Sequence, residues 1–212
     1  RFPGDPSVLN EKAVYVGSDE MTSGAFQGEF LAKFFKDQGK TDISYLMLNG
    51  ILGQTSTTNR TASVLKALED NGIKATAAAA PLAADYDRAT AMDMISPLLK
   101  TTKYDCIISN NDAMALGAVE AMQQQGLDPK SVPIVGIDAT ADGRQAIKDG
   151  TLAMTVFQNA EGQGRASLQA AANLIDGKPI AEGTGYEVDD ENEFIIWVPF
   201  EPVTIDNVAD YD

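Results

Sequence analysis

The chain has 212 residues, of which 44% are hydrophobic and 22% are charged, and its formal net charge is -15. These values are typical of one or two globular domains, and no apolar run is long enough to span a bilayer. The strong negative charge argues against a nucleic-acid partner, because binding to phosphates depends on clustered Lys and Arg. Histidine is absent. The commonest general base is therefore missing, and we expect no enzyme.

Other motifs that carry chemistry are also absent from the sequence. The single cysteine, Cys106, lies in an apolar run and is expected to be a small buried hydrophobe. There is no nucleophile elbow and no phosphate-binding loop of the Walker type. Gly162 and Gly164 have the spacing of a dinucleotide-binding loop, but its third glycine is missing. The sequence therefore predicts no cofactor.

From about Val14 onward, short aliphatic runs alternate with longer segments of helical period. The predicted strands are residues 13–17, 43–48, 74–79, 105–109, 134–137, 153–157, 186–188 and 194–198. The predicted helices are residues 23–38, 57–71, 86–100, 113–125, 141–148 and 162–176. This alternation indicates an α/β fold with a doubly wound parallel sheet. In such a sheet the carboxyl ends of the strands form the binding crevice.

Polar side chains follow several of the predicted strands at this edge. They mix acceptors with donors, as sugar hydroxyls require, and one aromatic ring among them offers a stacking face. The candidate ligand-binding residues are Gln54, Ser56, Arg60, Tyr86, Asn111, Asp138 and Gln158.

Each candidate also has a structural alternative. Asn111 or Asp112 could cap the helix that begins at Ala113, and residues 56–58 could likewise cap the helix predicted at residues 57–71. Arg60 could be a solvated helix arginine, and Tyr86 an ordinary edge aromatic. Asp138 has the weakest such alternative, because aspartate directly after a buried strand often serves a site.

Four segments together resemble bacterial periplasmic sugar-binding proteins of ABC transporters. These are the type I periplasmic binding proteins, and the similarity is strongest to the galactose/glucose- and ribose-binding branch. The segments are Tyr15-Val16-Gly17-Ser18-Asp19, Asn110-Asn111-Asp112-Ala113-Met114-Ala115-Leu116-Gly117-Ala118, Val135-Gly136-Ile137-Asp138-Ala139, and Ile147-Lys148-Asp149-Gly150-Thr151-Leu152-Ala153 leading into Thr155-Val156.

The resemblance implies roles for five of the candidates. The family's binding arginine, asparagine, aspartate and last amide fall on Arg60, Asn111, Asp138 and Gln158, and its stacking aromatic falls on Tyr86. Helix capping is then left to Asp112. Gln54 and Ser56 stand where the galactose/glucose proteins have a histidine and an aspartate, so the sugar stays open. The loop at residues 38–42 is too short for that branch's calcium site, and no metal is expected.

The resemblance also implies a two-lobed protein of which roughly the first third is absent here. Residues 1–157 plus 196–212 would form the complete second, sugar-binding lobe. Residues 158–195 would be a remnant of the first lobe. Its helix carries an apolar stripe that needs a partner surface, formed by Leu168, Ala171, Ala172 and Ile175.

The function implied is capture of a monosaccharide, a pentose or a hexose, between two lobes and its delivery to an ABC permease. A chemotaxis receptor is a further candidate partner. The expected location is the periplasm or the outer cell surface, with a lipid anchor in a Gram-positive bacterium. The alternative is the sugar-sensing effector domain of a LacI-type transcription repressor, which would require a helix-turn-helix segment upstream.

Overall fold

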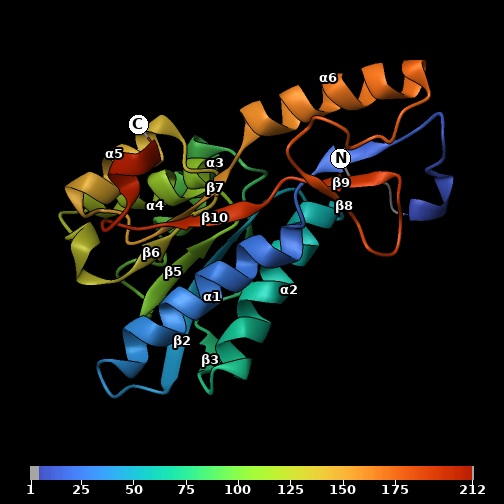
Figure 1. Ribbon diagram of the computed structural model, residues 1–212. Helices are drawn as coiled ribbons and strands as arrows, with labels where there is room; N and C mark the ends of the chain where they lie inside the picture. Colours follow the sequence, from blue (N-terminus) through green and yellow to red (C-terminus); the bar gives the residue numbers. More distant parts are fainter. Residues whose placement is uncertain (1–4, 212) are drawn as a thin grey trace. The chain divides into compact units, whose positions relative to one another are not determined.

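The computed structural model describes residues 5–211, which form two compact units. The larger unit contains residues 20–157 and 201–211, and the smaller contains residues 5–19 and 158–200 (Figure 1). Among the described helices, none is both long and apolar enough to cross a membrane.

A parallel sheet forms the centre of the larger unit. Its strands β2 (Asp42–Asn49), β3 (Lys74–Ala77), β5 (Cys106–Ser109) and β6 (Ile134–Val135) follow the order β3-β2-β5-β6. The short strand β4 (Leu82–Ala83) also pairs with β2. Parallel bridges from Val135 to Met154 and from Asp138 to Phe157 extend the sheet to β7 (Thr155–Gln158). The last strand, β10 (Phe200–Val203), pairs with β7.

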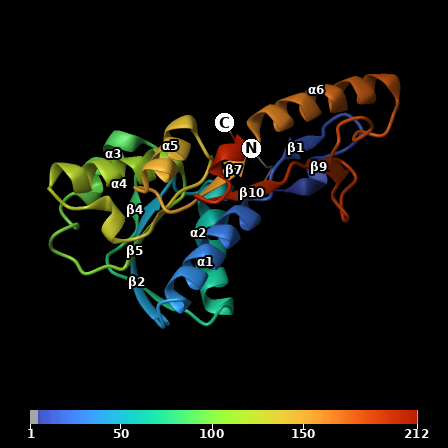
Figure 2. The ribbon, with the colours of Figure 1, turned by 60° about the vertical axis from the view of Figure 1, so that its left-hand side comes forward.

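Helices cover both faces of this sheet, as Figure 2 shows. The pair α1 (Glu20–Lys36) and α2 (Thr55–Asp70) lies on one face. On the other face lie α3 (Arg88–Ile95), α4 (Asp112–Gln124) and α5 (Ala141–Asp149). The core on this second face includes Leu46, Leu48, Ile95, Ile107, Met114 and Ile147. Cys106 is fully buried, as predicted. The predicted doubly wound arrangement is therefore confirmed.

The smaller unit consists of a three-stranded sheet and one long helix. Strand β1 (Tyr15–Gly17) pairs in parallel with β9 (Ile195–Trp197), which pairs antiparallel with β8 (Glu187–Val188). The helix α6 (Ala160–Asp176) packs against β1 through Ala170. Leu168 and Ile175 are 76% and 85% exposed. The stripe predicted to need a partner surface is thus uncovered within residues 5–211.

Three short 3-10 helices complete the described part of the chain. They are Pro6–Val8, Pro129–Ser131 and Val208–Tyr211. The first and second begin with an aspartate whose side chain accepts a backbone hydrogen bond, from Ser7 and Lys130 respectively. This is the usual way in which an aspartate satisfies the free amides at a helix start.

Local details of the sequence prediction were wrong in three places. The short strands β4 and β10 were not predicted. The helix expected at residues 86–100 is restricted to Arg88–Ile95. It starts late because Tyr86 has a left-handed φ of 64° and Asp87 caps the helix by accepting from the Thr90 amide. It ends early because Pro97 cannot donate a helical hydrogen bond.

The division into units differs from the predicted ranges. The prediction grouped residues 1–157 with 196–212, whereas the structure places residues 5–19 and 196–200 in the smaller unit. The reason is strand pairing, because residues 15–17 of β1 hydrogen-bond to β9 rather than to the larger sheet. The outermost residues of the predicted ranges, 1–4 and 212, lie outside the described part of the chain.

Candidate ligand-binding site at the carboxyl ends of the strands

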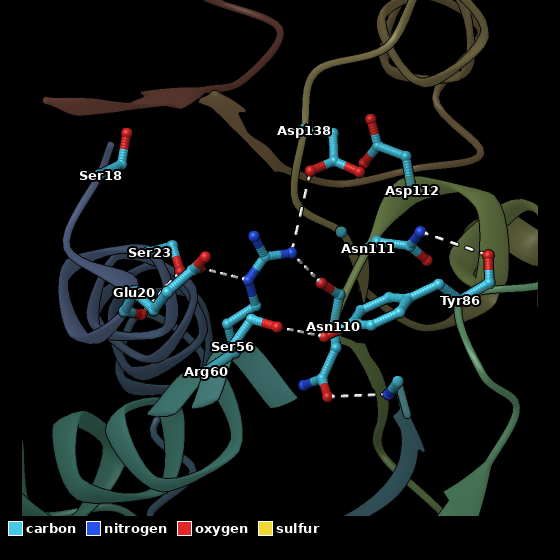
Figure 3. Close-up of polar contacts among 12 residues, drawn as sticks. Ser18, Glu20, Ser23, Ser56, Arg60, Tyr86, Asn110, Asn111, Asp112 and Asp138 are labelled. Atoms are coloured by element: carbon cyan, nitrogen blue, oxygen red, sulfur yellow. Dashed lines mark hydrogen bonds and ion pairs between the residues drawn. The ribbon is translucent and has the colours of Figure 1, made fainter. Parts of the chain in front are cut away.

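Arg60 lies at the centre of a polar cluster beside the carboxyl end of β5 (Figure 3). It projects from α2, and it is only 5% exposed. Its Nε donates to Glu20 Oε2 at 2.6 Å, and its Nη1 donates to the carbonyl oxygen of Asn110 at 2.7 Å. The same Nη1 lies 3.8 Å from Asp138 Oδ1. The alternative of a solvated helix arginine is therefore wrong.

The charges of this cluster shift the pKa values of its members. Burial lowers the pKa of Arg60, but Glu20 and Asp138 outweigh burial and raise it above its ordinary value. Burial raises the pKa of Asp138 to about 6, with repulsion from Glu20 adding to the rise and Arg60 opposing it. Two carboxylates thus share one guanidinium, and the Asp138 side chain remains 28% exposed. Asp138 is therefore positioned to accept further hydrogen bonds.

Asn111 caps helix α4, contrary to the expectation that Asp112 would do so. Its Oδ1 accepts from the amide of Met114 at 3.0 Å, and its Nδ2 donates to the carbonyl oxygen of Tyr86 at 3.5 Å. Asp112 is the first residue of the helix and is fully buried. Its side chain instead accepts from Thr140 and Thr155. The cap falls on Asn111 because that residue has the extended backbone that a cap requires.

Tyr86 and Ser56 meet through their hydroxyl groups. The hydroxyl of Tyr86 lies 2.8 Å from Ser56 Oγ and 2.8 Å from Thr57 Oγ1. Gly50 borders the Tyr86 ring, and a Cβ at this position would overlap the ring. Helix α2 has no side-chain cap, so the alternative that residues 56–58 cap it is wrong. The structure thus brings Ser56 to Tyr86, whose stacking role stays a prediction.

The two remaining candidates lie at the ends of other elements. Gln54 occupies the N-cap position of α2 without a side-chain capping bond and is partly buried. Gln158 is the last residue of β7 and the first residue of the second segment of the smaller unit. Its role in binding stays a prediction.

Glu20 and Asn110 were missed by the sequence analysis. Glu20 forms the shortest bond to Arg60, and Asn110 Oδ1 accepts from the Gly50 amide at 3.1 Å, which joins the loops after β2 and β5. The signal for Glu20 was present. It lies three residues after the first predicted strand, residues 13–17, whose end supplied none of the candidate residues.

The described cluster offers both acceptors and donors to a ligand. Asp138 supplies carboxylate acceptors, Asn111 Nδ2 is a donor with one long bond, and Arg60 is a fixed cation between them. A hydroxyl group both donates and accepts, so it suits such a mixed surface. In residues 5–211 no group of three or more Cys, Asp or Glu side chains is placed to hold a metal ion. The chemistry favoured is hydrogen bonding to a polyol.

Comparisons with known proteins give one matching family and several relatives. The family model described as "Periplasmic binding protein domain" matches residues 5–179. The D-galactose/methyl-galactoside binding periplasmic protein of Haemophilus influenzae is 36% identical over 99% of this chain and 64% of its own length. A putative rhizopine-binding protein of Rhizobium meliloti is 32% identical over 100% of this chain and 63% of its own length.

A solved structure is similar in both sequence and fold. It is an ABC transporter solute-binding protein from Bacillus halodurans with bound myo-inositol, which is 30% identical with a TM-score of 0.75. The similarity covers 95% of this chain and 64% of that protein. This chain thus spans slightly less than two thirds of the length of the relatives named here.

Proposed function

Because this chain belongs to the periplasmic binding protein family, we propose that it forms part of an extracytoplasmic solute-binding protein. The whole protein captures a monosaccharide, a pentose or a hexose, between two lobes and delivers it to the permease of an ABC importer. The larger unit supplies one wall of the site. The smaller unit, including α6, belongs to the other lobe in this proposal.

The observation that carries this proposal is the arrangement of Arg60 and Asp138. Their charged atoms lie 3.8 Å apart, which is longer than a direct hydrogen bond. A sugar hydroxyl beside this pair would accept from the guanidinium and donate to the carboxylate. Closure of the lobes would exclude water and strengthen these bonds, and micromolar affinity would require about 8 kcal/mol in total.

The relatives support transport of a polyhydroxylated ring rather than its chemical conversion. They are described as proteins that bind D-galactose or methyl-galactoside, a rhizopine, and myo-inositol, and the last is described as an ABC transporter protein. A permease is accordingly the main protein partner in the proposal, with a chemotaxis receptor as a second. The location follows from the same role, as either the periplasm or a lipid-anchored position on the outer surface of a Gram-positive cell.

No observation in the described residues favours a repressor effector domain. The relatives named above are described as binding proteins, and the one from Bacillus halodurans is described as a solute-binding protein of an ABC transporter. An enzyme is not favoured either, because the cluster pairs its carboxylates with a guanidinium and presents no activated nucleophile.

A thermal-shift screen of the full-length protein tests the proposal. The panel contains D-galactose, D-ribose, other pentoses and hexoses, and myo-inositol. A compound present at 100 times its Kd stabilises the folded state by about 2.7 kcal/mol, which raises Tm by several degrees. The matched control is Asp138→Asn, which should lose most of that shift. Absence of a shift with every compound would contradict the proposal.

A further inference from the structure

The turn that presents Asp138 has an unusual backbone. Asp138 and Ala139 have φ values of 119° and 49°, although neither is glycine. Side chains at such positions are strained, and the conformation persists only where the surroundings hold it. The amides of the turn are held on one side, because Asp138 N donates to Val156 O at 2.8 Å and Ala139 N donates to Thr155 Oγ1 at 3.2 Å.

Asp112 holds the turn from the other side. Its own amide donates to Ile137 O at 2.7 Å, just before the turn. Its Oδ2 accepts from Thr140 N at 2.8 Å, just after the turn. Its Oδ1 accepts from Thr155 Oγ1 at 2.6 Å, the same hydroxyl that receives the Ala139 amide. One buried residue therefore fixes both ends of the strained segment.

The surrounding chain leaves room for this carboxylate and for little else. A Cβ at Gly136 would clash with Asp112 Oδ1, and a Cβ at Gly143 would clash with Asp112 Oδ2. Neither glycine has a positive φ. Lack of space for a side chain, rather than backbone conformation, therefore explains why glycine occupies these two positions. Asp112 is also not required to cap its helix, since Asn111 does so. The carboxylate thus serves the turn.

We propose that Asp112 is a positioning residue that holds residues 138–140 in the one conformation in which the Asp138 carboxylate faces Arg60. Asp112 does not touch the ligand, because it is 0% exposed. Its effect on binding passes through Asp138, and this part of the inference rests on the proposed function.

Hydrogen exchange in the full-length protein tests the positioning without any ligand. In Asp112→Ala the Thr140 amide loses its acceptor and should exchange at least tenfold faster. In Asp112→Asn the amide oxygen replaces Oδ2 and the amide nitrogen donates to Thr155, so the protection of Thr140 should be retained. If Asp112→Ala does not fold, Thr155→Val removes the hydroxyl that bonds both Asp112 and Ala139, and increased exchange of the Ala139 amide is then expected.

The matched control is Asp105→Ala at the opposite end of β5. Asp105 Oδ2 accepts a hydrogen bond from the Ser44 amide at 2.7 Å. This variant therefore also deprives a backbone amide of its carboxylate acceptor, in the same unit. It should accelerate exchange at Ser44 and leave Thr140 unchanged. Equal exchange at Thr140 in Asp112→Ala and the unsubstituted protein would overturn the proposal.

Titration calorimetry with D-galactose, D-ribose and myo-inositol provides the second readout. The affinity for whichever compound binds should fall at least tenfold in Asp112→Ala, stay within threefold in Asp112→Asn, and stay unchanged in Asp105→Ala. An equal loss in Asp105→Ala would assign the effect to general destabilisation and overturn positioning. If the unsubstituted protein binds none of the three, the proposed function fails for them, and the exchange experiment alone decides the role of Asp112.

Discussion

At the scale of single residues, the Glu20–Arg60 pair carries a large part of the site's electrostatics. The Arg60 side chain is 6% exposed and that of Glu20 is 18% exposed. Glu20→Gln would leave a buried guanidinium with less compensation, and we expect it to lower the free energy of unfolding by about 1 to 3 kcal/mol. Urea denaturation measures this change.

The control for this prediction is Glu120→Gln. Glu120 also bonds an arginine, Arg88, at 2.6 Å, but both side chains are 39% exposed. An exposed pair of this kind contributes about 0 to 1 kcal/mol. Equal losses in the two variants would show that burial does not distinguish the Glu20–Arg60 pair.

The buried Asp112 predicts a dependence of stability on pH. Burial raises the pKa of Asp112 to about 7, with repulsion from Asp138 adding to the rise and bonds from Thr155 and Thr140 opposing it. An unfolded aspartate has a pKa near 3.9. Between about pH 4 and pH 7 the folded state therefore holds the proton more tightly, and stability falls as pH rises.

Asp112→Asn removes this titration, so its free energy of unfolding should fall less between pH 4 and pH 7 than that of the unsubstituted protein. The fall that remains is assigned to Asp138, whose pKa of about 6 is also raised by burial. Denaturant titrations at several pH values measure both curves. If the free energy of unfolding falls equally with pH in both proteins, the assignment of this titration to Asp112 is contradicted.

The sequence predicted the roles of residues that follow a strand. It did not predict roles that depend on tertiary contacts. Arg60, Asn111 and Asp138 were named from the polar positions after predicted strands, and the structure brings them near one another. The capping role of Asn111 depends on its extended backbone. The link from Asp112 to Thr140 joins residues 28 positions apart. The local sequence pattern left helix capping open between Asn111 and Asp112, and it carried no signal for the link from Asp112 to Thr140.

At the scale of elements, helix α6 presents two different faces. Leu168 and Ile175 are exposed, whereas Ala170 is fully buried against Ile180 and Ile196. The double substitution Leu168→Glu with Ile175→Glu should change the free energy of unfolding by less than about 0.5 kcal/mol per site. Ala170→Glu is the control and should destabilise by more than about 2 kcal/mol, because it buries a charge. Circular dichroism during denaturation measures both.

A large loss in the double variant would contradict the exposed placement of this stripe. The same double variant can also be compared in the full-length protein. In the proposed function α6 belongs to a lobe whose remaining part would cover the exposed face of this helix. A greater loss of stability in the full-length protein than in the 212-residue chain would show that residues outside this chain bury the stripe.

Element type was predictable wherever the hydrophobic period was long. Within residues 5–211, all six α-helices and eight of the ten strands coincide with predicted segments to within a few residues at most ends. Strands β4 and β10 escaped because β4 has only two residues and β10 contains Pro202, which disfavours a strand. Helix α5, predicted to end at residue 148, ends at Asp149 because Gly150 follows with a left-handed φ of 74°.

At the scale of the whole molecule, the fold class was predictable because the alternation of strands and helices leaves few topologies. The predicted family is confirmed by the match to residues 5–179. The division into units was less predictable. The pairing of β1 with β9 joins residues about 180 positions apart, and short strands of similar composition carry no signal for their partner.

The central claim is that Asp138 and Arg60 form one wall of a site for a monosaccharide or related polyol. Titration calorimetry of the full-length protein with D-galactose, D-ribose and myo-inositol tests it most directly. We predict that at least one compound binds with a Kd in the micromolar range or below, and that Asp138→Ala weakens it by about 2 to 4 kcal/mol, roughly 30-fold to 1,000-fold. Unchanged affinity in Asp138→Ala, or no binding of any compound by the unsubstituted protein, would contradict the claim.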